Sequence, residues 1–193
     1  WTFGYNEKGQ KIKERLRVGT VDDDSNDWLK EWDYDDFGNP TKYKDAQGNI
    51  WRFKFNSQGR VTEVTNPYLA TWQYTYDRSG RLLSSKSPLG YEETFIYNKR
   101  GLLTAYSDTF EPGKIAGAVF RYNRRGLLTK TIDIYGNAWN FSYDNAQNLI
   151  LSSDPEGREV RREYDTDQRL ISTIYPNGYR VNLKHFDTGL EGE

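Results

Sequence analysis

The chain has 193 residues, a formal net charge of −1 and no cysteine. The lack of cysteine excludes disulfides and thiolate zinc clusters, and the near-zero charge gives no electrostatic reason to expect nucleic acid or an anionic membrane as a partner. No apolar run approaches the roughly 20 residues that span a bilayer. Hydrophobic residues make up 35% of the chain and aromatic residues 16%, which suits a broad, thin sheet better than a thick core.

From its first residues the chain carries a short motif that recurs to the other end: an aromatic residue, Asp or Asn, two variable residues and Gly. The motif recurs every 21 residues from Gly38 onward, apart from one step of 25, so we predict a repeat architecture of about nine units. We expect the aromatic position, called the aromatic slot below, and the glycine to anchor each unit structurally. The aromatic slots are Tyr5, Tyr34, Phe55, Tyr76, Tyr97, Tyr122, Tyr143, Tyr164 and His185. The glycines are Gly9, Gly38, Gly59, Gly80, Gly101, Gly126 and Gly189, with Gln147 and Gln168 replacing glycine in two units.

Each unit is predicted to contain two strands and two turns. Before the slot, aromatic residues alternate with polar ones, as at Trp72, Tyr74 and Tyr76, and this period of two indicates a strand with one apolar face. Asp or Asn followed by Gly favours a tight turn, and an apolar residue such as Leu82 then opens the return strand. A second turn, such as residues 87–90, closes the unit. The prediction is an all-β chain of consecutive antiparallel β-hairpins.

Two insertions lengthen the period, near residues 18–30 and 107–118. The first contains Asp22, Asp23, Asp24 and Asp27, which could suggest calcium, but it lacks the glycine and the distal glutamate of a calcium loop. We therefore expect a solvated surface loop there, and a Gly- and Pro-bearing loop that bulges from the sheet at the second insertion. Residues 1–193 are interpreted as a single repeat region. Because the chain shows no signal peptide and does not begin with Met, we expect it to be a fragment of a larger protein.

The sequence Tyr76-Asp77-Arg78-Ser79-Gly80-Arg81-Leu82 is the clearest copy of the repeat. This pattern, in register along essentially the whole chain, resembles the YD repeat of the Rhs family, which includes bacterial polymorphic toxins, insecticidal toxin C components and teneurins. The resemblance implies a curved strip of hairpins that forms a segment of a spiralling β-shell, and in the bacterial members the shell encloses a C-terminal toxin. The self-cleavage motif of the family, Asp-Pro-x-Gly-Leu-x-Gly-Gly, is matched only loosely at residues 187–192, so cleavage is not carried over.

No residue is predicted to be catalytic, to bind a cofactor or to ligate a metal. His185 is the single histidine and occupies an aromatic slot, so we interpret it as an aromatic substitute and not as a general base. The regular recurrence of Asp at turn starts indicates turn closure, not paired acid and base catalysts. Gly48, Gly136 and Gly157 belong to second turns and not to a phosphate-binding loop.

The leading hypothesis is a non-catalytic structural segment of an Rhs-type shell that encapsulates a C-terminal toxin for delivery. Its expected partners are the rest of the same shell and the enclosed toxin domain, and beyond these the secretion machinery or a cell-surface glycan. The expected location is secreted or at the cell surface, after export from a bacterium. The alternative is a cell-surface adhesin or carbohydrate-binding module, because rows of Tyr and Trp can stack on sugar rings. Against that alternative, the same residues could stack on one another along the sheet.

Overall fold

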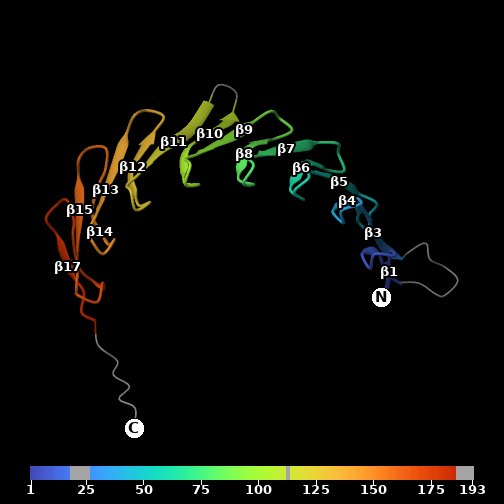
Figure 1. Cartoon of the computed structure of the whole chain (residues 1–193), viewed down its shortest axis with the longest axis horizontal. Helices are drawn as coiled ribbons and strands as arrows, with labels where there is room; N and C mark the ends of the chain where they lie inside the picture. The colour runs from blue at the N-terminus through green and yellow to red at the C-terminus, as the bar shows by residue number, and fades with distance from the viewer. Residues whose placement is uncertain (18–26, 112–113, 186–193) are drawn as a thin grey trace, which may run out of the picture. The chain divides into compact units, whose positions relative to one another are not determined.

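The computed structural model describes residues 1–17, 27–111 and 114–185, and the regular elements in these ranges are all β-strands (Figure 1). Seventeen strands form one antiparallel sheet in which strands that follow one another in the chain pair side by side. The predicted all-β fold of consecutive hairpins is confirmed. In the described ranges there is no helix long and apolar enough to cross a membrane.

The chain divides into two compact units, Trp1–Thr94 with Thr109–Glu111, and Phe95–Asp108 with Pro112–Glu193. The first unit contains β1 (Thr2–Tyr5), β2 (Lys11–Leu16), β3 (Trp28–Tyr34), β4 (Pro40–Lys44), β5 (Ile50–Phe55), β6 (Val61–Thr65), β7 (Thr71–Tyr76) and β8 (Leu82–Lys86). Two strands contribute residues to both units, β9 (Glu92–Tyr97) and β10 (Leu103–Glu111). The second unit contains β11 (Lys114–Tyr122), β12 (Leu128–Asp133), β13 (Ala138–Tyr143), β14 (Leu149–Ser153), β15 (Glu159–Tyr164), β16 (Leu170–Ile174) and β17 (Arg180–Asn182).

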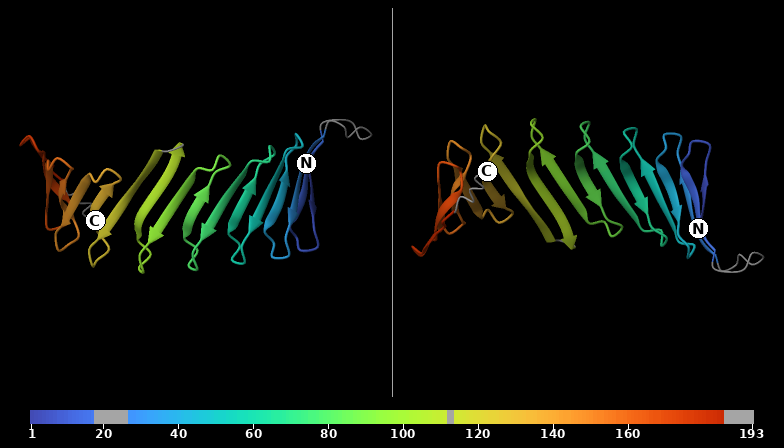
Figure 2. Two further views of the ribbon diagram at one scale, coloured as in Figure 1. Left: turned by 90° about the horizontal axis from the view of Figure 1, so that it is seen from above. Right: turned by 90° about the horizontal axis from the view of Figure 1, so that it is seen from below.

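Within each compact unit the turns lie alternately at the two ends of the strands, so that they form two rows along the sheet (Figure 2). Those that follow an aromatic slot are called first turns, and the others second turns. At Asp35 the backbone amide donates to the carbonyl oxygen of Asn39, 2.9 Å away, and the amide of Gly38 donates back to the carbonyl oxygen of Asp35. The Asp35 carboxylate also accepts the amides of Phe37 and Asn39, at 3.0 and 2.8 Å. The fourth turn residue has a left-handed φ, +92° at Gly38 and +75° at Gln147, which explains the preference for glycine there.

Strands that precede a first turn, such as β7, have one apolar and one polar face, as predicted. In β7 the three aromatic residues are half-buried, whereas Gln73 and Thr75 are exposed. The strands β5 and β13 show the same alternation. Apolar residues meet across neighbouring strands, with Phe53 opposite Val64 and Val64 opposite Trp72. The aromatic face is therefore built from cross-strand pairs that continue from one hairpin to the next.

The sheet has no buried hydrophobic core. Among the described residues no hydrophobic side chain is fully buried, and Ser172, which is 2% exposed, is the single residue that is buried as a whole, backbone included. Stability must then come from backbone hydrogen bonds and from cross-strand side-chain pairs, each of which contributes roughly 0.2–1 kcal/mol. Each hairpin depends on its neighbours in the sheet because it has no second layer to pack against.

The second insertion does not form the bulging loop that we predicted. The strands β10 and β11 have nine residues each, so the extra residues lengthen a hairpin. The hydroxyl group of Thr109 in this extension accepts the amide of Glu92 at 2.7 Å and donates to its carbonyl oxygen at 3.2 Å. The residues on either side of Pro112 and Gly113 extend the two strands beyond the length found in the other hairpins. At Gly117 a Cβ would lie 2.6 Å from the carbonyl oxygen of Tyr106, so glycine permits close approach of the two backbones.

The predicted first insertion, 18–30, overlaps a strand at its end. The strand β3 begins at Trp28, so the last three residues of the predicted insertion are strand. Asp27 is an ion-pair partner of Arg15, with 2.5 Å between the Asp27 Oδ2 and Arg15 Nε atoms and an Asp27 side chain only 3% exposed. Asp22 to Asp24 lie outside the described residues.

Candidate functional site

The aromatic slot connects each hairpin to the one before it. The hydroxyl of Tyr143 donates a hydrogen bond to the carbonyl oxygen of Leu128, 2.9 Å away and fifteen residues earlier. The accepting residue is the second after the glycine position of the preceding repeat. The same bond, called the slot hydrogen bond below, joins Tyr34 to Lys11, Tyr76 to Val61, Tyr122 to Leu103 and Tyr164 to Leu149, at 2.7 to 3.1 Å.

A β-bulge accompanies the slot and orients its side chain. The pairing register shifts between Ser142 and Tyr143, and it shifts at the equivalent place in β1, β3, β5, β7, β11 and β15. Because a bulge bends its strand and redirects a side chain, Tyr143 can pair with Leu149 of its own hairpin while its hydroxyl reaches the preceding one. A phenol of ordinary pKa, about 10, is already a donor at neutral pH, and burial raises the pKa of Tyr143 further.

Two slots lack tyrosine, and they differ in what they can donate. His185 Nε2 lies 2.7 Å from the carbonyl oxygen of Leu170, again fifteen residues earlier. The histidine therefore supplies the polar contact of the slot as well as a ring, which the sequence interpretation did not foresee. Phe55 fills the slot with a ring and no hydroxyl. The predicted Gly189 lies outside the described residues.

Side chains also connect successive first turns, which lie in one row at the same end of the strands in each compact unit. The Arg100 guanidinium donates to the carbonyl oxygen of Arg124, 2.9 Å away. At Gly126, in the same turn, a Cβ would lie 3.1 Å from Arg100 Nη2, so the glycine leaves room for the crossing side chain. Equivalent links to backbone carbonyls join Lys8 to Asp36, Gln58 to Arg78 and Arg125 to Asn145.

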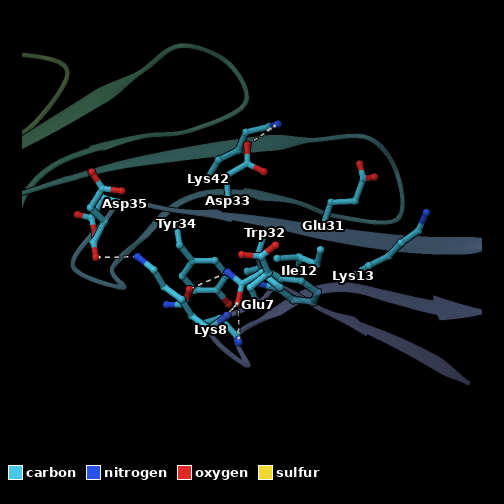
Figure 3. A pocket seen from close by; sticks show the side chains of 13 residues that line it. Glu7, Lys8, Ile12, Lys13, Glu31, Trp32, Asp33, Tyr34, Asp35 and Lys42 are labelled. Atoms are coloured by element: carbon cyan, nitrogen blue, oxygen red, sulfur yellow. Dashed lines mark hydrogen bonds and ion pairs between the residues drawn. The ribbon is translucent and has the colours of Figure 1, made fainter.

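A groove of about 660 Å³ lies between the first two hairpins, with Lys8 reaching from the first turn toward the turn that starts at Asp35 (Figure 3). Its lining is charged but mixed in sign. On the second hairpin, Lys42 and Asp33 form an exposed ion pair of 2.9 Å. Carboxylates and ammonium groups offset one another in this lining, and among its residues no nucleophile is paired with a base.

The turn carboxylates accept hydrogen bonds from groups of their own turns. Hydrogen bonds from the Asn39 side chain and from turn amides lower the pKa of Asp35, and Asn148 does the same for Asp144. At Asp77 the main cause of the lowered pKa is the backbone amide of the fifth turn residue. A carboxylate with a lowered pKa is a weak proton acceptor at neutral pH. Within residues 1–17, 27–111 and 114–185 no group of three or more His, Asp or Glu side chains could hold a metal ion.

The family model for the RHS repeat matches the chain at residues 34–68, 76–110 and 143–180, which together make up more than half of its length. The chain belongs to the RHS repeat family. Each matched stretch of this RHS repeat chain begins at an aromatic slot, Tyr34, Tyr76 or Tyr143. No curated protein is significantly similar in sequence.

Solved structures of Tc toxin complexes share the fold of this RHS repeat chain. The Photorhabdus luminescens Tc holotoxin pore with a mutated TccC3 is 14% identical, with a TM-score of 0.64 over 90% of this chain and 11% of that chain. The crystal structure of TcdB2-TccC3 is 14% identical, with a TM-score of 0.64 over 92% of this chain and 12% of that one. The complex of TcdB2-TccC3 with Cdc42 is 14% identical, with a TM-score of 0.62 over 87% and 11%. This chain thus spans about a tenth of the length of the structures that it matches.

Sequence reasoning located the aromatic slots of the RHS repeat but missed the atom that each slot contacts. A signal was present, because seven of the nine slots hold tyrosine, and a half-buried phenol usually finds a hydrogen-bond partner. The acceptor is a backbone carbonyl, which every residue has, so the sequence does not identify it. The links between first turns were also missed, since their donors vary among Lys, Gln and Arg.

Proposed function

We propose that this chain is a structural segment of a protein shell that encloses a toxin domain, with no catalytic activity of its own. The observation that carries this proposal is the continuity of the hairpins: successive strands pair, and the slot hydrogen bond reaches from one hairpin back to the preceding one. A sheet of this kind can grow into a wall without a buried core, and it leaves few strand edges exposed to aggregation. Membership of the RHS repeat family and the fold shared with Tc toxin structures support the same role.

In this proposal the slots and the turn glycines are structural anchors, and the rest of the shell is the first partner. Tyr5 occupies the slot in β1, and its side chain is 59% exposed. By the rule that the later slots follow, its hydroxyl would donate to a hairpin placed before β1. We infer that a further hairpin of the larger protein pairs there, so that residues 1–193 form one repeat region of that protein. The second partner is the enclosed toxin, and delivery of a toxin by a bacterium implies export to the outside or to the cell surface.

The test uses the full-length protein that contains these repeats. A cryo-EM map is expected to show the repeats in the wall of a closed space that holds further density. The part of the protein outside the repeats, expressed in bacteria, should then stop growth, whereas the 193-residue chain alone should be harmless. A map with no enclosed space, or a remainder that is harmless to several kinds of target cell, would refute the proposal.

A further inference from the structure

One turn departs from the rule that governs the others. Fourteen described turns are closed by the same two backbone hydrogen bonds, and thirteen of them begin with Asp, Asn or Ser. In those thirteen the side-chain oxygen of the first residue accepts the amide of the fifth. The fourteenth turn begins with Tyr175, which has no such oxygen near the backbone. There Asn177 Oδ1 accepts the amide of Tyr179 instead, at 3.0 Å.

This substitution places two tyrosines side by side on an open surface. The rings of Tyr175 and Tyr179 have centroids 6.1 Å apart and planes inclined by 29°. The two residues are 42% and 63% exposed. Together with Pro176, Asn177 and Val181 they line a shallow pocket of about 440 Å³. We call the two rings the aromatic platform.

Polar side chains line a second groove next to Tyr175. This groove of about 470 Å³ is lined by Tyr175, Pro176, Arg158, Glu159 and Arg161, among others. The charges of this groove are already compensated, because Arg161 pairs with Glu159 at 2.8 Å and Arg158 pairs with the carboxylates of its own turn. The groove thus offers hydrogen-bond donors and acceptors without a net positive field that would select a phosphate or another anion.

We propose that the aromatic platform and the adjoining groove bind a neutral sugar unit of a glycan. A pyranose ring presents a face of C–H groups that packs on an aromatic ring, while its hydroxyl groups point outward to polar partners. The platform supplies the aromatic surface for the C–H face. The polar partners of the hydroxyl groups are the Asn177 amide group, the two phenols and the Arg–carboxylate pairs. An apolar surface with a few fixed polar groups is the usual composition of a small-ligand site.

A proline-rich peptide also packs on exposed aromatic rings, and its carbonyl oxygens can accept hydrogen bonds from the arginines, but its prolines have no N–H or O–H group to donate to the carboxylates. The sugar is therefore the occupant that uses both halves of the site. Its position at one turn, and not in every repeat, also separates this surface from the aromatic face of the sheet, where rings such as Phe53 and Trp72 lie opposite apolar residues of the neighbouring strands.

The experiment titrates maltose, cellobiose and lactose into the 193-residue chain and follows binding by saturation-transfer NMR. At least one disaccharide is expected to bind, with contacts assigned to the platform. Tyr179→Ala should weaken binding at least tenfold, whereas Tyr175→Phe should change it less than about threefold because the ring remains. Tyr135→Ala is the control, since Tyr135 is 83% exposed in another second turn and is expected to leave binding unchanged.

A second variant separates binding from folding. Tyr175→Asp restores the residue type that the other turns use, so the hairpin should fold at least as well as before, yet the platform is lost and binding should disappear. The site is disproved if none of the three disaccharides binds at 10 mM, if binding survives Tyr175→Asp, or if a polyproline peptide binds and the sugars do not. Such a failure would leave the shell proposal intact, because that proposal rests on hairpin pairing and not on this turn.

Discussion

Removal of one hydroxyl group tests the slot hydrogen bond. In Tyr143→Phe the ring keeps its place on the aromatic face, and the 2.9 Å bond to the carbonyl oxygen of Leu128 is lost. A protein hydrogen bond contributes about 0.5–1.5 kcal/mol net, so we expect the free energy of unfolding to fall by about 1 kcal/mol. Ser142→Ala is the matched control, because Ser142 is exposed on the polar face of the same strand, and a surface change of this kind stays within about 0.5 kcal/mol.

The reverse substitution should raise the free energy of unfolding. Phe55 is the slot without a donor, and the carbonyl that corresponds to Leu128 in the preceding repeat is that of Pro40, two residues after Gly38. In Phe55→Tyr the new hydroxyl is expected to reach this carbonyl and to stabilise the sheet by roughly 0.5–1 kcal/mol. A lower free energy of unfolding in Tyr143→Phe and a higher one in Phe55→Tyr would show that the slot requires a hydrogen-bond donor as well as a ring.

The assay is urea unfolding followed by tryptophan fluorescence, combined with hydrogen exchange. Because arrays of repeats can unfold in parts, the fluorescence midpoint alone is not a two-state free energy. Exchange of the amides in β12 and β13 reports the hairpins that Tyr143 joins. An unchanged exchange rate in Tyr143→Phe, together with a destabilised Phe55→Tyr, would mean that the slot acts by packing alone.

Three further predictions concern single residues. The hydrogen bond from the Asn148 side chain is the main reason that the pKa of Asp144 is lowered, so the stability from this carboxylate is present above the unfolded pKa of about 3.9 and is lost as the pH falls through the lower folded value; Asp144→Asn should reduce the drop in urea midpoint between pH 7 and pH 3. Gly117→Ala should cost about 1–3 kcal/mol, because its Cβ would lie 2.6 Å from the carbonyl oxygen of Tyr106, and a normal melting temperature would contradict the close approach. The buried Ser172 hydroxyl has no hydrogen-bond partner among the residues that the structure describes, so Ser172→Ala should raise the free energy of unfolding by roughly 1 kcal/mol, and a lower midpoint in the same titration would mean that the hydroxyl has a role in the sheet.

The repeat period was sufficient to predict the fold, because each position in the period has a local physical cause. Asp and Gly at a turn, or Trp72 and Tyr74 on one face of a strand, act within a few residues of themselves, and local patterns of this kind are visible in a sequence. The slot hydrogen bond could not be predicted because its acceptor is a backbone atom fifteen residues away. The second insertion was misjudged because Pro112 and Gly113 indicate a turn but not how long the strands beside it are. The aromatic platform was overlooked because Tyr175 was read as part of an ordinary turn.

The slot hydrogen bond has a direction along the chain: in the bonds described, the acceptor precedes the donor. During synthesis the carbonyl that a tyrosine needs has therefore already left the ribosome when that tyrosine emerges. Each new hairpin can be added to an existing edge with contacts that span few residues, which favours rapid folding. Assembly from the N-terminus keeps a single growing edge at any moment, so the nascent protein exposes little unpaired strand to other chains.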